Sequence, residues 1–151
     1  MSDVILQRIA RAAAEEQQPR DVRARNAAAI IRETREYRWV GIYDVTDDEV
    51  SLLAYAGAAA PASPRFFVSQ GLTAAAVKSR APVVVGDVSK DERYLTAFST
   101  TRSEAIVPVL GAESGIVIGT LDVESERVDA FDSDDTAFLE DCAAALMPLY
   151  E

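Results

Sequence analysis

Histidine is absent from the 151-residue sequence, and cysteine occurs once, at Cys142. The first absence excludes Ser-His-Asp and Cys-His catalysis, His-ligated zinc and acid–base steps by imidazole. A single cysteine excludes an intramolecular disulfide and dithiol redox chemistry. Lysine is also scarce, since only Lys78 and Lys90 are present. Carboxylates, hydroxyls and arginines remain, and this set favours binding over catalysis.

Long apolar runs are missing as well. No stretch reaches the roughly 18 apolar residues that cross a membrane, and Asp3 interrupts a signal-peptide pattern. We therefore expect a cytoplasmic protein without a membrane partner. The excess of arginine over lysine and the many alanines are typical of GC-rich genomes, and we expect a bacterial source. With 49% hydrophobic and 26% charged residues, the composition indicates one globular domain.

Negative charge is in excess but unevenly distributed. The net charge is −10, yet residues 1–40 carry eight arginines against six acids, while residues 41–151 carry 19 acids against seven basic residues. An acidic body repels nucleic acid, so we expect no nucleic-acid partner. The acids either keep the protein soluble or surround a pocket for an amino-bearing ligand. The arginines lie either on a solvated face or on a basic stripe that docks on a second copy.

Hydrophobic periodicity divides the chain into helical and extended segments. Helices are expected from Ser2, from Pro19 to about Tyr37, from Gly71 to before Pro82, around 91–99, and from Asp132 or Ser133 to Tyr150. Extended segments are expected at 38–46, 49–57, 66–68, 83–85, 104–110 and 115–123. This order predicts an α+β sandwich.

The sandwich is expected to contain an antiparallel sheet of about six strands. The N- and C-terminal helices cover one face, and loops and short helices cover the other. The segment 38–46 has the pattern of a central strand. Val40 and Ile42 point to one face, and Trp39, Gly41 and Tyr43 point to the other, so both faces carry large apolar groups and both are covered.

Three segments carry a resemblance to a known family. They are the paired strands RWVGIYDV and VSLLAYAG, the stretch VSQGLTAAAVKSRAPVVVGDVSKDERY, and the end RSEAIVPVL…SGIVIGTLDVES…FDSDDTAFLE. In this order and spacing they resemble a GAF domain over roughly residues 20–150. The resemblance implies a GAF-like sandwich, with residues 1–18 as an N-terminal helix and residues 19–151 as a single GAF domain.

Within that superfamily the chain is similar to the free methionine-R-sulfoxide reductases, which reduce the free amino acid. The family's Trp and Tyr on the first strand match Trp39 and Tyr43. Its Ser-Glu ahead of a Val-Pro strand matches Ser103 and Glu104. Its paired acids on the next strand match Asp122 and Glu124, the latter a Glu where the family usually has Asp. The resemblance implies that these residues hold the methyl-sulfinyl end and the amino group of a ligand.

The chemistry of the reductases lies in three cysteines that this chain lacks. Ungapped matching puts Ser63, Thr73 and Ala97 at their positions, and Phe98 where an acid follows the third. Hydroxyls have a pKa far above that of a thiol, so they cannot attack sulfoxide sulfur and later form a disulfide. Cys142 lies on the apolar side of the last predicted helix and is expected to be an inert core residue. We expect no enzyme and no catalytic residues.

The acids and aromatics define a candidate site. Asp122 and Glu124 are two residues apart on a predicted strand and share a face, which Glu104 on the partner strand can join. Beside Trp39 and Tyr43, three acids suit an ammonium group. Alternatively, the aromatics belong to the core, Glu104 caps a turn and the other two acids are solvated. The expected lining is completed by Phe66, Phe67, Leu72, Thr73, Tyr94 and Phe98.

Three functions remain open. The favoured one is a non-catalytic GAF-type sensor with a regulatory role that binds a small molecule without cofactor or metal and forms a homodimer through its terminal helices. The alternative is a degenerate reductase homologue that binds free methionine or its sulfoxide without reduction. A residual enzyme of unknown type is disfavoured by the missing His and by the lack of a Cys at the matched positions.

Loops 58–65 and 91–102 are expected to cover the pocket, and Phe98 would close it in a ligand-free interaction domain.

Overall fold

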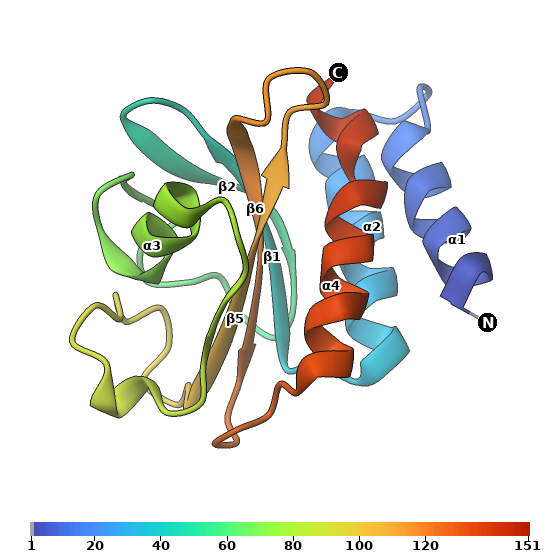
Figure 1. Cartoon of the computed structure of the whole chain (residues 1–151). Helices are drawn as coiled ribbons and strands as arrows, with labels where there is room; N and C mark the ends of the chain where they lie inside the picture. The colour runs from blue at the N-terminus through green and yellow to red at the C-terminus, as the bar shows by residue number, and fades with distance from the viewer. Residues whose placement is uncertain (1) are drawn as a thin grey trace.

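A six-stranded sheet runs through the middle of the protein in the computed structural model, which describes residues 2–151 (Figure 1). Its strands are β1 (Trp39–Val45), β2 (Glu49–Ala56), β3 (Arg65–Phe67), β4 (Val83–Val85), β5 (Ser103–Leu110) and β6 (Val117–Ser125). Their spatial order is β3-β2-β1-β6-β5-β4, and all neighbours are antiparallel. The strand predicted at 38–46 is therefore central, as expected.

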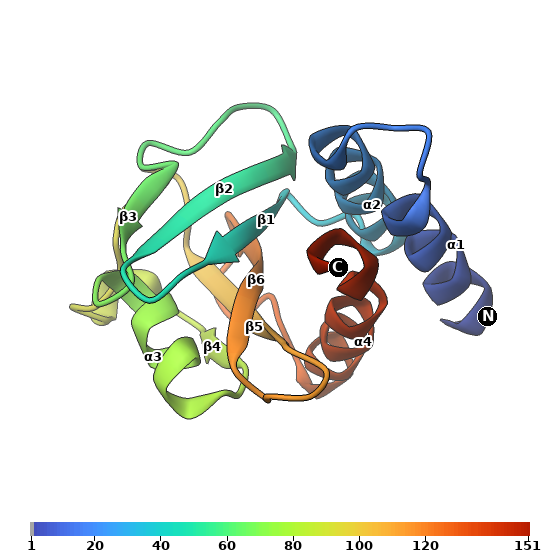
Figure 2. The ribbon, with the colours of Figure 1, turned by 90° about the horizontal axis from the view of Figure 1, so that it is seen from above.

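The helices are divided between the two faces of the sheet (Figures 1 and 2). One face is covered by α1 (Ser2–Ala14), α2 (Arg20–Arg35) and α4 (Ser133–Ala145), and the other by α3 (Gly71–Ser79) with the neighbouring loops. Helix α1 is outermost and packs on α2 and α4. This arrangement confirms the predicted α+β sandwich. Among the described residues, no helix combines the length and hydropathy that crossing a membrane requires.

Two helix predictions are wrong in their extent or place. The segment 91–99 contains turns and irregular backbone, and the short helical turn lies before it, at Val88–Lys90. The last helix ends at Ala145 and is followed by a 3-10 turn at Met147–Tyr150. Pro148 explains this ending, because it lacks the N–H that would continue the α-helical hydrogen bonds.

Strand β1 contributes side chains to two separate hydrophobic cores, one on each face of the sheet. Val40 and Ile42 are buried beneath the terminal helices, whereas Trp39 and Tyr43 are buried on the opposite face. Gly41 lies between the two aromatics. A methyl group at this position would overlap the indole ring of Trp39 and come within 3.1 Å of a Tyr43 ring carbon. The predicted alternation is confirmed, and glycine provides the space that the indole needs.

Tyr150 fastens the last turn of the chain to the sheet. Its hydroxyl donates to the carbonyl oxygen of Tyr43 at 2.8 Å, and the guanidinium of Arg20 lies 5.3 Å from the centre of its ring. Arg20 also forms two hydrogen bonds to the Asp44 carboxylate, at 2.6 and 2.9 Å. Gly119 leaves room for the phenol, since a methyl group there would overlap it. Helix α2, β1 and the C-terminal turn therefore meet at one point.

We expect Gly119→Ala to lower the free energy of unfolding by about 1–3 kcal/mol, the usual cost of overpacking, because the added methyl must displace Tyr150. Urea denaturation measures the change. In a Tyr150→Ala background the same substitution should cost less, since the obstructing ring is gone. An equal cost in both backgrounds would contradict the proposed overlap.

Candidate functional site

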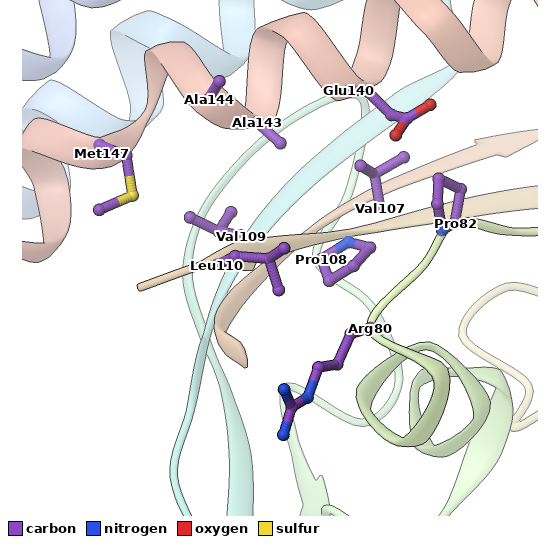
Figure 3. A pocket seen from close by; sticks show the side chains of 10 residues that line it. All are labelled: Arg80, Pro82, Val107, Pro108, Val109, Leu110, Glu140, Ala143, Ala144 and Met147. Atoms are coloured by element: carbon purple, nitrogen blue, oxygen red, sulfur yellow. The ribbon is translucent and has the colours of Figure 1, made fainter. Parts of the chain in front are cut away.

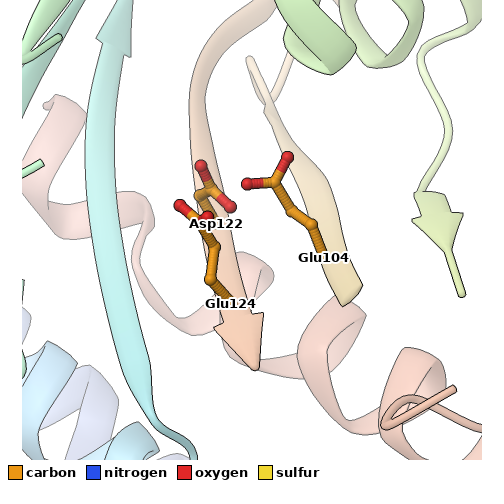
Figure 4. A group of neighbouring side chains, drawn as sticks. All are labelled: Glu104, Asp122 and Glu124. Atoms are coloured by element: carbon orange, nitrogen blue, oxygen red, sulfur yellow. The ribbon is translucent and has the colours of Figure 1, made fainter. Parts of the chain in front are cut away.

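Three acidic side chains converge on the face of the sheet that the terminal helices leave free (Figure 4). A carboxylate oxygen from each of Glu104, Asp122 and Glu124 lies within 4.8 Å of the others. Glu104 on β5 is paired with Glu124 on β6, and Asp122 lies two residues earlier on the same face of β6. Only 4%, 7% and 1% of these residues is exposed. The predicted convergence is present, and the acids are buried rather than solvated.

The triad is electrostatically unfavourable when fully ionised. Burial raises the pKa of all three carboxyls, because their charged forms lose hydration. The charges of Asp122 and Glu124 raise the pKa of Glu104 further, and that of Glu124 raises the pKa of Asp122. Within residues 2–151, no ion pair involves the three acids. The triad therefore retains protons at a pH where exposed carboxyls have lost theirs.

Hydrogen bonding in the triad is incomplete. Glu124 Oε1 accepts hydrogen bonds from the hydroxyls of Tyr94 at 3.0 Å and Thr101 at 2.9 Å. Glu124 Oε2 and Asp122 Oδ1 are buried and accept none from any N–H group or hydroxyl of the described residues, so only a proton that the triad itself retains can reach them. A buried acceptor without a donor costs about 1–3 kcal/mol. These two oxygens mark the place where the donors of a bound molecule, or a hard divalent cation, would be stabilised.

The triad lines a narrow pocket with a free volume of about 20 Å³. The remaining lining residues are Tyr43, Ser63, Phe66, Gly71, Leu72, Thr73, Leu95 and Ala97. The walls stand close together, and the free space between them accommodates roughly one water molecule. A larger ligand therefore requires the loops over the pocket to move outward.

A second pocket, also with a free volume of about 20 Å³, shares Glu124 with the first. It is lined by Trp39, whose indole N–H donates to the Ala59 carbonyl oxygen at 3.0 Å. Phe98 packs edge-on against the indole, with 5.3 Å between the ring centres. Residues of both predicted roof segments, 58–65 and 91–102, line the two pockets.

Most of the residues predicted to line the site lie in or beside these two pockets. Direct lining residues are Trp39, Tyr43, Phe66, Leu72, Thr73, Phe98, Glu104, Asp122 and Glu124. Tyr94 reaches the site through its hydrogen bond to Glu124. Phe67 is the exception: it is 67% exposed, because neighbouring residues of a strand point to opposite faces and Phe66 takes the inward position. The inclusion of Phe67 in the lining was wrong.

Sequence reasoning missed Leu95 and Thr101 as site residues. Both belong to the irregular segment before β5, and the Thr101 hydroxyl reaches Glu124 only because this segment folds back over the sheet. A loop of this kind has no periodicity that could reveal the contact. Ser63 and Ala97 also line the pocket, and their match to reductase cysteines was the available signal.

The three positions matched to the reductase cysteines lie around the same pocket as the acids. Ser63, Thr73 and Ala97 all belong to its lining. The single cysteine, Cys142, is buried in the core beneath the terminal helices on the opposite face. Burial raises the pKa of its thiol to about 12. The chain therefore presents no thiol to the pocket.

Comparisons with known proteins agree with this geometry. A model of the GAF domain family matches residues 19–147. GAF domain-containing protein A of Dictyostelium discoideum is 30% identical over 115 residues, which cover 76% of this chain and 70% of that protein.

Two similar solved structures are free methionine-R-sulfoxide reductases. The enzyme from Neisseria meningitidis, in complex with its substrate, is 30% identical, with a TM-score of 0.85 over 99% of this chain and 87% of that one. The type II enzyme from Thermoplasma acidophilum is 28% identical, with a TM-score of 0.78 over 93% of this chain and 94% of that one.

We expect Glu104→Gln to flatten the pH dependence of stability. A carboxyl whose pKa rises on folding stabilises the folded state fully below its unfolded pKa, here 4.5, and this contribution is lost as the pH rises through the folded pKa. Above about pH 4.5, the free energy of unfolding of the wild type should therefore fall more steeply with rising pH than that of Glu104→Gln, by up to about 1.4 kcal/mol per pH unit for one group.

Urea denaturation at several pH values measures both profiles. Glu113→Gln, which changes an exposed glutamate, is the matched control and should follow the wild type. Parallel profiles for the wild type and Glu104→Gln would contradict the raised pKa of Glu104 in the folded protein.

Proposed function

Because the chain belongs to the GAF domain family, we propose that it is a non-catalytic, cytoplasmic sensor domain that binds a small amino-bearing molecule. The observation that carries the proposal is the pair of buried, unpartnered oxygens on Asp122 and Glu124. An ammonium group brings both the N–H donors and the positive charge that these oxygens lack. Tyr43 in the same pocket adds an aromatic wall that attracts a cation.

An ammonium group suits this site better than a metal ion. Calcium takes six to eight oxygen ligands, and magnesium requires a nearly ideal octahedron. Beyond the three acids, Phe66, Leu72 and Leu95 offer no ligand atom from their side chains, and the other side-chain oxygens of the lining are the uncharged hydroxyls of Tyr43, Ser63 and Thr73. A primary ammonium needs only three acceptors, and the triad supplies one carboxylate for each.

We also propose that the bound molecule is not transformed. Ser63, Thr73 and Ala97 stand around the pocket, and none of them provides a nucleophile that is ionised at neutral pH. Cys142 is too deeply buried on the other face to take part.

A second candidate is a reductase relative that binds free methionine or its sulfoxide without reducing it. The similarity to the Neisseria meningitidis enzyme, which was solved with its substrate, favours this candidate. Under this hypothesis, Glu104 and Asp122 hold the amino group, while Trp39 and Tyr43 contact the sulfur end.

We further propose that the domain works as a homodimer through its terminal helices. Helix α1 is outermost and leaves Val4 exposed. Three of the arginines in this region, Arg20, Arg35 and Arg38, form ion pairs with acids of the same copy. Their positive charge is therefore already partly neutralised. The surface through which two copies meet therefore need not contain these arginines.

Ligand binding is tested by thermal denaturation with methionine, methionine-R-sulfoxide and a panel of other amino acids and amines. A site filled at 100 times its dissociation constant adds about 2.7 kcal/mol, and the melting temperature should rise by roughly 5–10 °C. Glu104→Gln and Asp122→Asn should abolish the rise, whereas the exposed Glu113→Gln should retain it. Fluorescence of Trp39, the only tryptophan, gives an independent readout.

The outcomes separate the candidates. A response to methionine compounds alone supports the second candidate, and a response to other amines supports the first. If no amine raises the melting temperature, the proposed ligand class is wrong, and the domain acts through protein contacts.

Turnover is tested with free methionine-R-sulfoxide, NADPH and a thiol-disulfide reducing system. We expect no oxidation of NADPH above the rate without the protein, because no thiol faces the pocket. Cys142→Ala should leave ligand binding unchanged. Reproducible NADPH consumption that depends on the protein and on the sulfoxide would contradict the non-catalytic function.

A further inference from the structure

The three carboxyl groups of the triad point toward one another, and no positive charge lies among them (Figure 4). One oxygen from each of Glu104, Asp122 and Glu124 lies within 4.8 Å of the others, and none of the residues is more than 7% exposed. Two negative charges at this separation repel each other strongly when water is excluded, and a third adds to the repulsion. The empty triad therefore keeps protons, and a bound positive charge would remove the reason for keeping them.

Hydrogen bonding in the pocket leads to the same conclusion. Glu124 Oε2 and Asp122 Oδ1 accept from no N–H group or hydroxyl of the described residues, so the O–H of a protonated carboxyl in the triad is the donor left to them. A primary ammonium brings three N–H donors and needs an acceptor for each. An O–H that points into the same space competes with them. The ammonium and the retained proton therefore exclude each other at these oxygens.

The other side chains around the triad do not titrate with it. Tyr43 of β1 and Tyr94 of the segment before β5 carry the remaining titratable groups near the triad, and burial raises the pKa of both phenols, so they stay protonated. Helix α3 contributes Leu72 and Thr73, and the segment between β2 and β3 contributes Ser63, none of which is charged. A proton that leaves the triad therefore finds no acceptor in the pocket.

The arginines nearest to other hollows of the molecule do not compensate the triad. Arg38 lines the neighbouring pocket, but its Nε lies 2.9 Å from Oε1 of Glu126 and forms an exposed ion pair. Arg80 lines a separate groove between α4 and β5, and no residue of that groove lines the triad pocket (Figure 3). Within residues 2–151, the positive charge that the triad lacks must come from a bound molecule.

We infer that an amine binds at the triad in exchange for a proton. The ammonium enters, the O–H bond of one carboxyl breaks with its electron pair left on the oxygen, and the proton passes to water. All three carboxylates are then free to accept the N–H groups of the ammonium. This inference rests on the proposed amine-binding function and adds the regulation of the same site.

Proton exchange makes the site respond to amine and pH together. Because the proton competes with the amine, the dissociation constant should fall by about tenfold per pH unit wherever the empty triad holds one proton more than the occupied one. The same concentration of amine therefore fills more of the sites at higher pH, as long as the amine itself stays protonated.

The ammonium ion is the most direct probe. The free space of about 20 Å³ at the triad admits one particle of the size of a water molecule, and the ammonium ion meets this limit without movement of the loops. Tetramethylammonium at equal ionic strength is the matched control, since it carries the same charge but has no N–H group and is larger. A pH-indicator dye in weakly buffered solution near neutral pH counts the protons released by the full chain, and Trp39 fluorescence and the melting temperature follow occupancy.

We expect about one proton per chain at saturation with ammonium chloride and none with tetramethylammonium chloride. Butylamine, which needs the loops to open, should show the same release. Its dissociation constant should fall about tenfold between two pH values one unit apart. Glu113→Gln, which changes an exposed glutamate, should release as many protons as the wild type.

Infrared spectroscopy examines the empty triad without any ligand. Near neutral pH, the wild type should show the C=O stretch of a protonated carboxyl, and ammonium should remove this band. Glu104→Gln should weaken it, because one carboxyl and part of the repulsion are gone, whereas Glu113→Gln should retain it.

The outcomes separate the exchange from the binding function. Ammonium or butylamine that fills the site without releasing a proton would overturn the exchange and leave the proposed amine binding intact. A wild-type spectrum without a protonated carboxyl near neutral pH would overturn it as well. If neither these probes nor any amine or amino acid of the thermal denaturation panel binds, the proposed function fails and the exchange fails with it.

Discussion

Three carboxyl groups held close together in a buried pocket are the constraint on which the rest of this structure depends. Their removal from water and their mutual repulsion cost free energy. Most of what offsets this cost lies on the other face of the sheet, where α2 and α4 cover an apolar core. The central strands therefore have one face whose apolar packing stabilises the fold and one face whose buried acids destabilise it. A positively charged group at the triad would offset the repulsion between the carboxylates.

The site also illustrates how a fold can be retained while the chemistry depends on a few side chains. Ser63, Thr73 and Ala97 present hydroxyl and methyl groups to the pocket. The one thiol, that of Cys142, lies in the core on the opposite face of the sheet. Glu104, Asp122, Glu124 and Tyr43 line the same pocket. For a pocket without a sulfur nucleophile, the activity that we propose is binding, through recognition of charge and shape.

The pocket and the helical layer are joined through β1. The Tyr43 side chain lines the pocket, while its carbonyl oxygen accepts a hydrogen bond from Tyr150 at the end of the chain. The pairing of β1 with β2 shifts register between Ile42 and Tyr43. The connection between the pocket and the helical layer thus lies at a register shift of β1, where the ladder of hydrogen bonds is interrupted.

The sequence by itself determined the strands and their two faces, and it placed Asp122 and Glu124 on one face, because side chains alternate with period two along a strand. It left open whether Glu104 joins them in a buried site or caps a turn, and the pairing of Glu104 with Glu124 in the folded sheet decided this. The sequence did not determine the helical turn before residue 91 or the outward position of Phe67. Only the tertiary structure decided these, along with the narrowness of the pocket and the contact of Thr101 with Glu124. They depend on how irregular loops fold over the sheet, and loops carry no periodic pattern from which that path can be deduced.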